Sequence, residues 1–150
     1  MLLGAMVAAC SPNSAVSNTA LDRSPAGMEQ VPLRIRTARG AHKFVVEVAR
    51  TVQEQSRGLM FRQSLGPDQG MIFPHDAPHD ASFWMKNTLI PLDMIFIRAD
   101  GTIARIEANT VPLSLEPVNS GEPVGAVLEI AGGRAAELGI NPGDRVEWPH

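Results

Sequence analysis

The 150-residue sequence contains no tyrosine and only one cysteine, Cys10, and both shortages narrow what the protein can do. Two tryptophans and five phenylalanines therefore supply all of its aromatic side chains. A lone cysteine excludes an internal disulfide framework, and it also excludes a zinc site built from several thiolates. The chemistry of this chain must come from its other polar residues.

An excess of positive charge is also missing. The chain has 13 Lys and Arg against 16 Asp and Glu, which gives a net charge of −3, and its basic residues are scattered. Binding to nucleic acid through phosphates needs a basic patch, so we predict no nucleic-acid partner. Nucleophile-elbow, phosphate-loop and zinc-protease motifs are absent as well. We therefore expect no cofactor, and we favour a non-catalytic role over an enzymatic one.

The first ten residues, MLLGAMVAAC, end in small residues followed by cysteine. Val7-Ala8-Ala9-Cys10 resembles a bacterial lipobox, in which the cysteine is lipidated and becomes the mature N-terminus. The alternative is a short apolar terminus with an incidental cysteine, since no Lys or Arg precedes the apolar run. We expect residues 1–10 to be a lipoprotein signal segment. Cys10 would then anchor the protein on the periplasmic side of a bacterial envelope, which excludes thiol catalysis.

Residues 11–31 are rich in Ser, Pro, Asn, Ala and Gly and lack periodic apolar positions. Such a composition predicts a flexible tether. Its root-mean-square reach is on the order of 25 Å, enough to hold a domain just off a membrane. The pattern changes at Pro32, and we expect residues 32–150 to form a single domain.

Short apolar runs at close spacing indicate strands throughout that domain. We expect strands at 33–37, 42–48, 71–73, 92–97, 102–108 and 124–130, and a last one ending at 148. Pro74 should end the strand at 71–73. Many short strands with little helix predict a mostly β fold, a compact antiparallel sandwich or barrel-like domain with one or two short helices.

Local motifs refine this picture. Thr51-Val-Gln-Glu54 has the pattern of a capping box and predicts a short helix that ends near Gly58. Residues 132–138 predict one or two further helical turns. Asp100-Gly101 predicts a two-residue type I′ hairpin turn. Gly143-Asp144 resembles the GD box of small β-barrels, in which the aspartate caps the turn.

The run Phe83-Trp-Met-Lys-Asn-Thr88 is the most specific stretch of the chain. It is accompanied by Thr51-Val-Gln-Glu-Gln55, Gly58-Leu-Met-Phe-Arg62, Gly70-Met-Ile-Phe73, Pro91-Leu-Asp93, Val127-Leu-Glu129, Leu138-Gly-Ile140 and Gly143-Asp144. Together these stretches resemble the DUF192 family, small bacterial and archaeal proteins whose biochemical function is not established. The resemblance implies a compact, mostly β and often exported domain, and it supplies no catalytic residues.

The same region holds the candidate ligand-binding residues. They are Arg57, Arg62, Trp84, Lys86, Asn87, Asp93 and Glu129. Asp93 should share a strand face with two isoleucines, and such an acid needs a partner. It either pairs with an arginine or caps the turn at 87–91, which we favour, or it forms a pocket floor with Lys86, Asn87 and Glu129. Whether Lys86 meets Asp93 depends on a one-residue shift of register.

Two arginines, Arg57 and Arg62, flank a short apolar run. They could clamp an anion. We favour the alternative, in which one is a surface residue and the other pairs with Asp93 or Glu129.

Two weaker candidates concern metals. His75 and His79, with neighbouring aspartates, suit Zn²⁺, but Pro78 breaks any helix that would align them, so we expect no metal site. Met60, Met71, Met85 and Met94 could offer thioethers to Cu(I), although each sits in an apolar run that favours a place in the core.

These patterns favour a non-catalytic module that uses the 84–87 and Asp93 region. Its partner would be an unknown small molecule, a glycan or an envelope protein. The alternative is a hydrolase-like or metal-dependent enzyme that uses Asp93, Glu129 and Lys86. A purely structural envelope lipoprotein is the third possibility.

Overall fold

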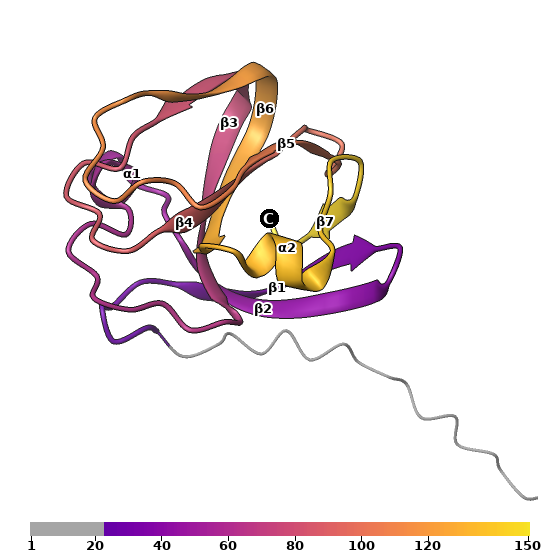
Figure 1. The fold of residues 1–150 in the computed structure, drawn as a ribbon, viewed down its shortest axis with the longest axis horizontal. Helices are drawn as coiled ribbons and strands as arrows, with labels where there is room; N and C mark the ends of the chain where they lie inside the picture. The colour runs from indigo at the N-terminus through magenta and orange to yellow at the C-terminus, as the bar shows by residue number, and fades with distance from the viewer. Residues whose placement is uncertain (1–22) are drawn as a thin grey trace, which may run out of the picture.

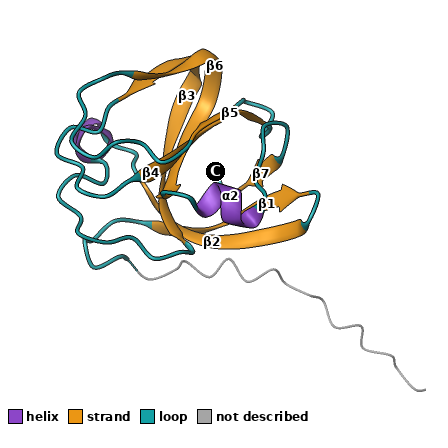
Figure 2. Ribbon diagram, viewed as in Figure 1, coloured by secondary structure: helices purple, strands orange, loops and turns teal. Residues whose placement is uncertain are grey.

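The computed structural model describes residues 23–150, which form one curled sheet with two short helices (Figure 1). The elements are β1 (Gln30–Thr37), β2 (Gly40–Val48), α1 (Val52–Arg57), β3 (Gln69–Phe83), β4 (Leu92–Ile97), β5 (Ile103–Glu107), β6 (Val118–Ala131), α2 (Arg134–Leu138) and β7 (Arg145–Glu147). Figure 2 shows how far strands outweigh helices, which confirms the predicted mostly β class. The predicted signal segment with Cys10 and most of the tether lie outside the described residues.

The sheet has the order β5-β4-β6-β3-β2-β1-β7, and its two outer strands approach each other. A bridge joins Thr102 to Arg145, and the backbone N–H of Val146 donates to the carbonyl of Gly101 at 2.8 Å. This closure confirms the barrel-like prediction. Neighbouring strands are antiparallel except β2 and β3, which are parallel because the crossover between them contains α1.

Four strands are longer than the sequence predicts, among them β2, which begins two residues early at Gly40, and β6, which begins at Val118 instead of 124. β3 passes through Pro74 and ends only at Phe83, so the expected stop at Pro74 is wrong. The register against β6 shifts between Pro74 and His79, and a bulge tolerates a proline because the residue there owes no ladder hydrogen bond. β1 also begins at Gln30, two residues before the expected start of the domain.

Three of the four predicted local motifs are confirmed, and one of them is the helical turns expected at 132–138, which form α2. The Thr51 hydroxyl accepts from the N–H of Glu54 at 3.1 Å, and the Glu54 carboxylate accepts from the N–H of Thr51 at 2.8 Å. This capping box starts α1, which ends at Gly58. The Asp144 carboxylate accepts from the N–H of Asn141 at 2.8 Å, so it caps the turn before β7.

The fourth motif forms a different turn from the predicted type I′. Of the two central residues expected there, only Gly101 has a positive φ, at 88°. Its N–H donates to the carbonyl of Arg98, whose own N–H donates to the carbonyl of Thr102. The hairpin therefore has a three-residue loop with a glycine bulge, and the Asp100 carboxylate accepts from the N–H of Thr102 instead of adopting positive φ.

The sheet buries apolar side chains on both faces. One face packs inside the curl with α2, which Figure 1 shows enclosed by the strands; its core includes Ile35, Val46, Ile72, Ile95, Leu128 and Ala135. The other face lies toward α1 and the loops; its core includes Leu59, Met71, Phe73, Met85, Met94, Phe96 and Val127. Three of the four methionines considered for Cu(I) are thus fully buried in this second core.

Candidate functional site

Asp93 is a completely buried acid whose carboxylate is saturated by backbone donors. One oxygen accepts from the N–H groups of Asn109 and Gly133 at 2.8 and 2.9 Å, and the other accepts from the N–H of Ala135 at 2.8 Å. The residue preceding α2 is Gly133, which has no side chain, so Asp93 caps this helix from a neighbouring strand. The partners are neither an arginine nor the 87–91 turn, and the role is structural.

Lys86 and Asn87 do not lie opposite β4, so neither of the two expected registers with Asp93 occurs. They occupy a turn in which the N–H of Thr88 donates to the carbonyl of Met85. Lys86 is exposed, and its ammonium lies 5.0 Å from the centroid of the Trp84 ring. Asn87 has a positive φ of 53°, which an asparagine tolerates, and its carbonyl accepts from the N–H of Phe61. Asn87 therefore has a structural role, since it connects its own turn to the loop that contains Phe61.

The two arginines have separate partners. Arg62 donates to the carboxylate of Glu47 at 2.7 Å, and Glu47 is only 5% exposed. Arg57 lies at the end of α1 with its guanidinium 5.9 Å from the centroid of the Phe61 ring. Both nevertheless line one hollow beside residues 26–28. One of them does neutralise a buried acid, as expected, but the acid is Glu47 and not Asp93 or Glu129.

Glu129 is the buried acid that differs from the others. It is 5% exposed, and no hydrogen bond or ion pair to its carboxyl occurs among residues 23–150. No fully enclosed side-chain nitrogen or oxygen in this part of the chain lacks a partner, so the carboxyl oxygens of Glu129 are in contact with solvent. It pairs in register with Met71 on β3 and with Met94 on β4, so it points to the α1 side of the sheet. Burial raises the pKa of the Glu129 carboxyl to about 8. At neutral pH this group is largely an uncharged acid.

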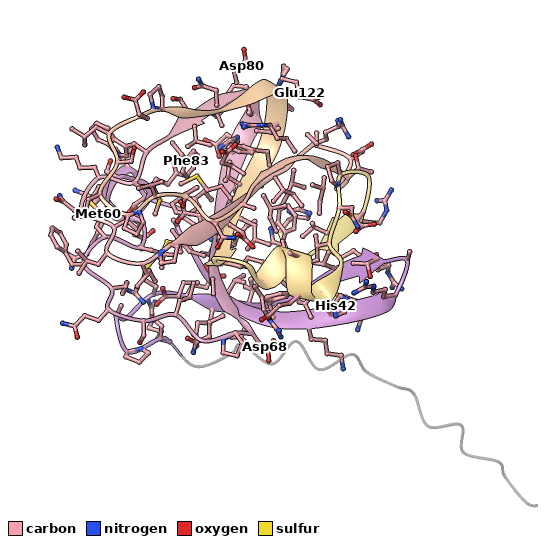
Figure 3. The ribbon with its side chains drawn as sticks, viewed as in Figure 1. His42, Met60, Asp68, Asp80, Phe83 and Glu122 are labelled. Carbon is pink, nitrogen blue, oxygen red and sulfur yellow. The ribbon has the colours of Figure 1, made fainter. Side chains whose placement is uncertain are left out.

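A cleft of about 410 Å³ opens above Glu129. Arg57 and Gln55 from α1, Met60 from the following loop, the rings of Phe73 and Phe83, and Trp84 and Thr88 surround it. Figure 3 shows Met60 and Phe83 on the side of the molecule where α1 and the loops gather. The cleft thus brings together Arg57, Trp84 and Glu129 from the predicted set, and it leaves out Arg62, Lys86, Asn87 and Asp93.

His75 and His79 also line this cleft. Their ring centroids are 4.0 Å apart. The two histidines lie on either side of the irregularity in β3, which brings their rings together without a helix. Nδ1 of His75 lies 2.9 Å from the carbonyl of Val124, and burial is the main cause that lowers the His75 pKa. Within the described part of the chain no group of three or more His, Cys, Asp or Glu could hold a metal ion.

Several exposed apolar side chains lie at or beside the mouth of the cleft, and the loops there are hydrogen-bonded to one another. Exposed apolar residues there and in the adjoining loops are Val52, Phe61, Trp84, Leu89, Val111, Leu113 and Leu115. Phe61 and Leu113 both have a φ of 64°, a strained value for such side chains. The N–H of Leu113 donates to the carbonyl of Thr88, and that of Met85 to the carbonyl of Ser114. These bonds hold the apolar rim in place.

Residues 34–148 match the model of the DUF192 family, which is described as "Uncharacterized ACR". The chain belongs to the DUF192 family. No match was found among curated proteins. Family membership supplies a fold for this domain and no activity.

Two solved structures resemble this DUF192 domain closely. A protein of unknown function from Novosphingobium aromaticivorans DSM 12444 is 45% identical, with a TM-score of 0.84 over 93% of this chain and 100% of that one. A protein from Sinorhizobium meliloti 1021, provisionally described as a transcription regulator, is 43% identical. Its TM-score is 0.79 over 81% of this chain and 95% of that one.

Two residues that the sequence prediction missed shape the DUF192 cleft and its surroundings. Glu47 is the buried partner of Arg62, and a lone acid in the apolar run 44–48 was the available signal. Gln55 donates to the carbonyls of Ala49 and Pro74, so it ties α1 to β3 beside the cleft. Gln55 ends one of the family-like stretches, but its role was not predicted, since the path of β3 past Pro74 was not expected.

Proposed function

We propose that this DUF192 protein is a non-catalytic binding module of the bacterial cell envelope, and that its ligand enters the cleft above Glu129. The observation that carries the proposal is an acid, 5% exposed, that has no partner among residues 23–150 and lies at the floor of a cleft with aromatic rings in its wall. Burial of most of this residue costs hydration of its carboxyl, whose oxygens still reach the solvent of the cleft, and a ligand that hydrogen-bonds to them there recovers that cost. The cleft sets aromatic rings beside several polar groups, and clefts of this size that combine both are typical ligand sites.

Anchoring through Cys10 is the second part of the proposal. Met28 packs against the core on the α1 side, and residues 26–28 line a hollow with Arg57 and Arg62. Residues 26–28 therefore lie close to the cleft, which Arg57 also lines. No helix within residues 23–150 is long and apolar enough to cross a membrane.

A role in transcription, provisionally described for the Sinorhizobium meliloti protein, is not part of this proposal. The net charge is −3, and six described arginines already pair with acids. Neither feature favours contact with phosphates.

An enzymatic role is the second candidate, and the Glu129 pKa of about 8 favours it, because a general acid works best when its pKa lies near the operating pH. Asp93 and Lys86 do not reach this cleft, so the acid would have to act with His75 or His79.

The test is a chemical-shift titration of the full chain with benzyl alcohol, benzylamine and benzoate. We expect shifts at Phe83, Trp84 and Glu129, and none at Asp93 or Ala135 on the other face. Trp84→Ala should weaken binding, whereas Trp148→Phe, distant from the cleft, serves as the matched control. If no fragment shifts the cleft residues, or if shifts scatter over the surface, the proposal is wrong.

A further inference from the structure

We propose that the cleft receives an organic ammonium group, seated between the Glu129 carboxylate and the aromatic wall of Phe73, Phe83 and Trp84. This inference rests on the proposed function, because it names the chemical class of the ligand for the same cleft. The ligand would be an amine with an apolar body.

Comparison of the three buried acids supports a cationic ligand. Glu47 has the guanidinium of Arg62, and Asp93 has three backbone N–H donors. Glu129 has no such group within the described chain, although it is equally buried. A buried carboxylate is stabilised by a cation or by several donors. A ligand ammonium brings both.

The walls of the cleft fit the same ligand. The Phe73 and Phe83 rings meet edge to face, with centroids 5.1 Å apart, and Trp84 stands beside them at the mouth. Aromatic faces attract cations, and tryptophan does so most strongly. The Trp84 ring already lies 5.0 Å from the Lys86 ammonium. An amine entering the cleft would meet rings first and the acid at the floor.

Among residues 23–150, the charged groups around the cleft supply no counter-ion to the Glu129 carboxylate. From β3, His75 and His79 face the cleft, and the lowered pKa keeps His75 neutral at pH 7. From α1, Arg57 is the one Lys or Arg among the described lining residues, and it is exposed and lies over the Phe61 ring.

The remaining charges near this face are already engaged or point elsewhere. On β2, Glu47 is neutralised by Arg62, and on β5 Glu107 pairs with Arg105. Asp93 on β4 points to the opposite face, and Lys86 stacks on Trp84. None of these groups competes for the Glu129 carboxyl.

The pH dependence separates this ligand class from a neutral one. Ammonium binding requires the ionised carboxylate, so affinity should rise as the pH increases toward and through the Glu129 pKa of about 8. A ligand that accepts a hydrogen bond from the protonated acid would show the opposite slope.

The experiment compares benzylamine with benzyl alcohol, which has the same shape without the charge, on the full chain at about pH 6 and about pH 8.5. At the higher pH we expect benzylamine to bind at least about tenfold more tightly, and at the lower pH the advantage should fall to about threefold or less. Glu129→Gln should abolish both the preference and its pH dependence. Glu116→Gln, which removes the same charge from an exposed position, should change neither.

The comparison of the two compounds on the wild-type chain does not depend on any variant folding. Equal affinities at both pH values, or tighter binding of the alcohol, would overturn the ammonium inference and leave the proposed cleft intact. Failure of both compounds to shift any cleft residue would overturn the inference and the proposed function together.

Discussion

Asp93 and Glu129 lie on adjacent strands, one register position apart, and their side chains point to opposite faces of the sheet. The first faces the curl and caps α2, and the second faces the cleft. The sheet itself separates them, so they cannot act together on one substrate as a carboxylate pair. One acid caps α2, and the carboxyl of the other has no hydrogen-bond partner among residues 23–150 and lines the cleft.

Replacing Asp93 by asparagine should destabilise the protein by about 3 kcal/mol, because three charge-assisted bonds to backbone N–H groups are lost or weakened and one amide N–H₂ would face a donor. Urea unfolding measures the change. Asp76→Asn, at an exposed position on β3, is the matched control and should change stability by less than about 0.5 kcal/mol. A tolerated Asp93→Asn would show that this cap contributes little.

Stability should depend on pH through Glu129. Its pKa is raised from 4.5 to about 8 in the folded state, so the folded protein binds the extra proton between these values. Stability is therefore full below pH 4.5, falls as the pH rises, and levels off above about 8. At pH 8.5, Glu129→Gln should be more stable than the wild type by roughly 3 kcal/mol, and the difference should shrink toward pH 5. Parallel stability curves for the two proteins would contradict the burial of this acid.

Breaking the Glu47–Arg62 pair from one side should cost more than removing both partners. Arg62→Met leaves Glu47 buried and unpaired, and we expect a loss of about 2 kcal/mol, since the arginine side is partly exposed to solvent. The double variant Glu47→Gln with Arg62→Met should recover at least half of that loss. A double-mutant cycle in urea measures the coupling, and additive losses would mean that the pair is not coupled.

His75 should titrate below the usual range for histidine, first because it is buried and also because His79 lies against it. A titration followed by NMR of the imidazole resonances gives the value. His79→Gln should move the His75 pKa upward, since the like-charge contribution disappears, whereas His42→Gln on β2 should leave it unchanged. A His75 pKa at the ordinary value would show that its ring is solvated.

Membrane attachment should depend on Cys10. In a bacterial host with lipoprotein processing, Cys10→Ser should move the protein from the membrane fraction to the soluble fraction, because the lipid is the proposed anchor. Ser11→Ala is the neighbouring control and should stay with the membrane. Unchanged fractionation of Cys10→Ser would contradict lipid anchoring.

The sequence predicted the parts of this fold that local chemistry determines. The Thr51–Glu54 capping box and the Asp144 turn cap each need only residues a few positions apart, and both formed. β4 was predicted with its bounds because the run 92–97 is apolar apart from Asp93. The predicted type I′ turn at Asp100-Gly101 was wrong, since a three-residue loop with a bulge also needs only one glycine at positive φ.

The positions of residues that depend on contacts between distant parts of the chain could not be predicted from local sequence patterns. β3 continues past Pro74 because β6 lies beside it and accepts a bulge, and only that strand brings His75 and His79 into the cleft. The partners of Asp93 lie 16 to 42 positions away: Asn109 just after β5, and Gly133 and Ala135 at the start of α2. Alternation placed Asp93 on the face of Ile95, but nothing local showed that Glu129 faces the other way.

The account depends most on Glu129 as an unpaired acid that a ligand cation can reach. The direct measurement is a ¹³C titration of the Glu129 carboxyl by NMR, with and without benzylamine. We predict an apparent pKa of about 8 in the free protein and a lower value in the presence of the amine. A pKa near 4.5 that benzylamine leaves unchanged would contradict both the buried acid and the cationic ligand.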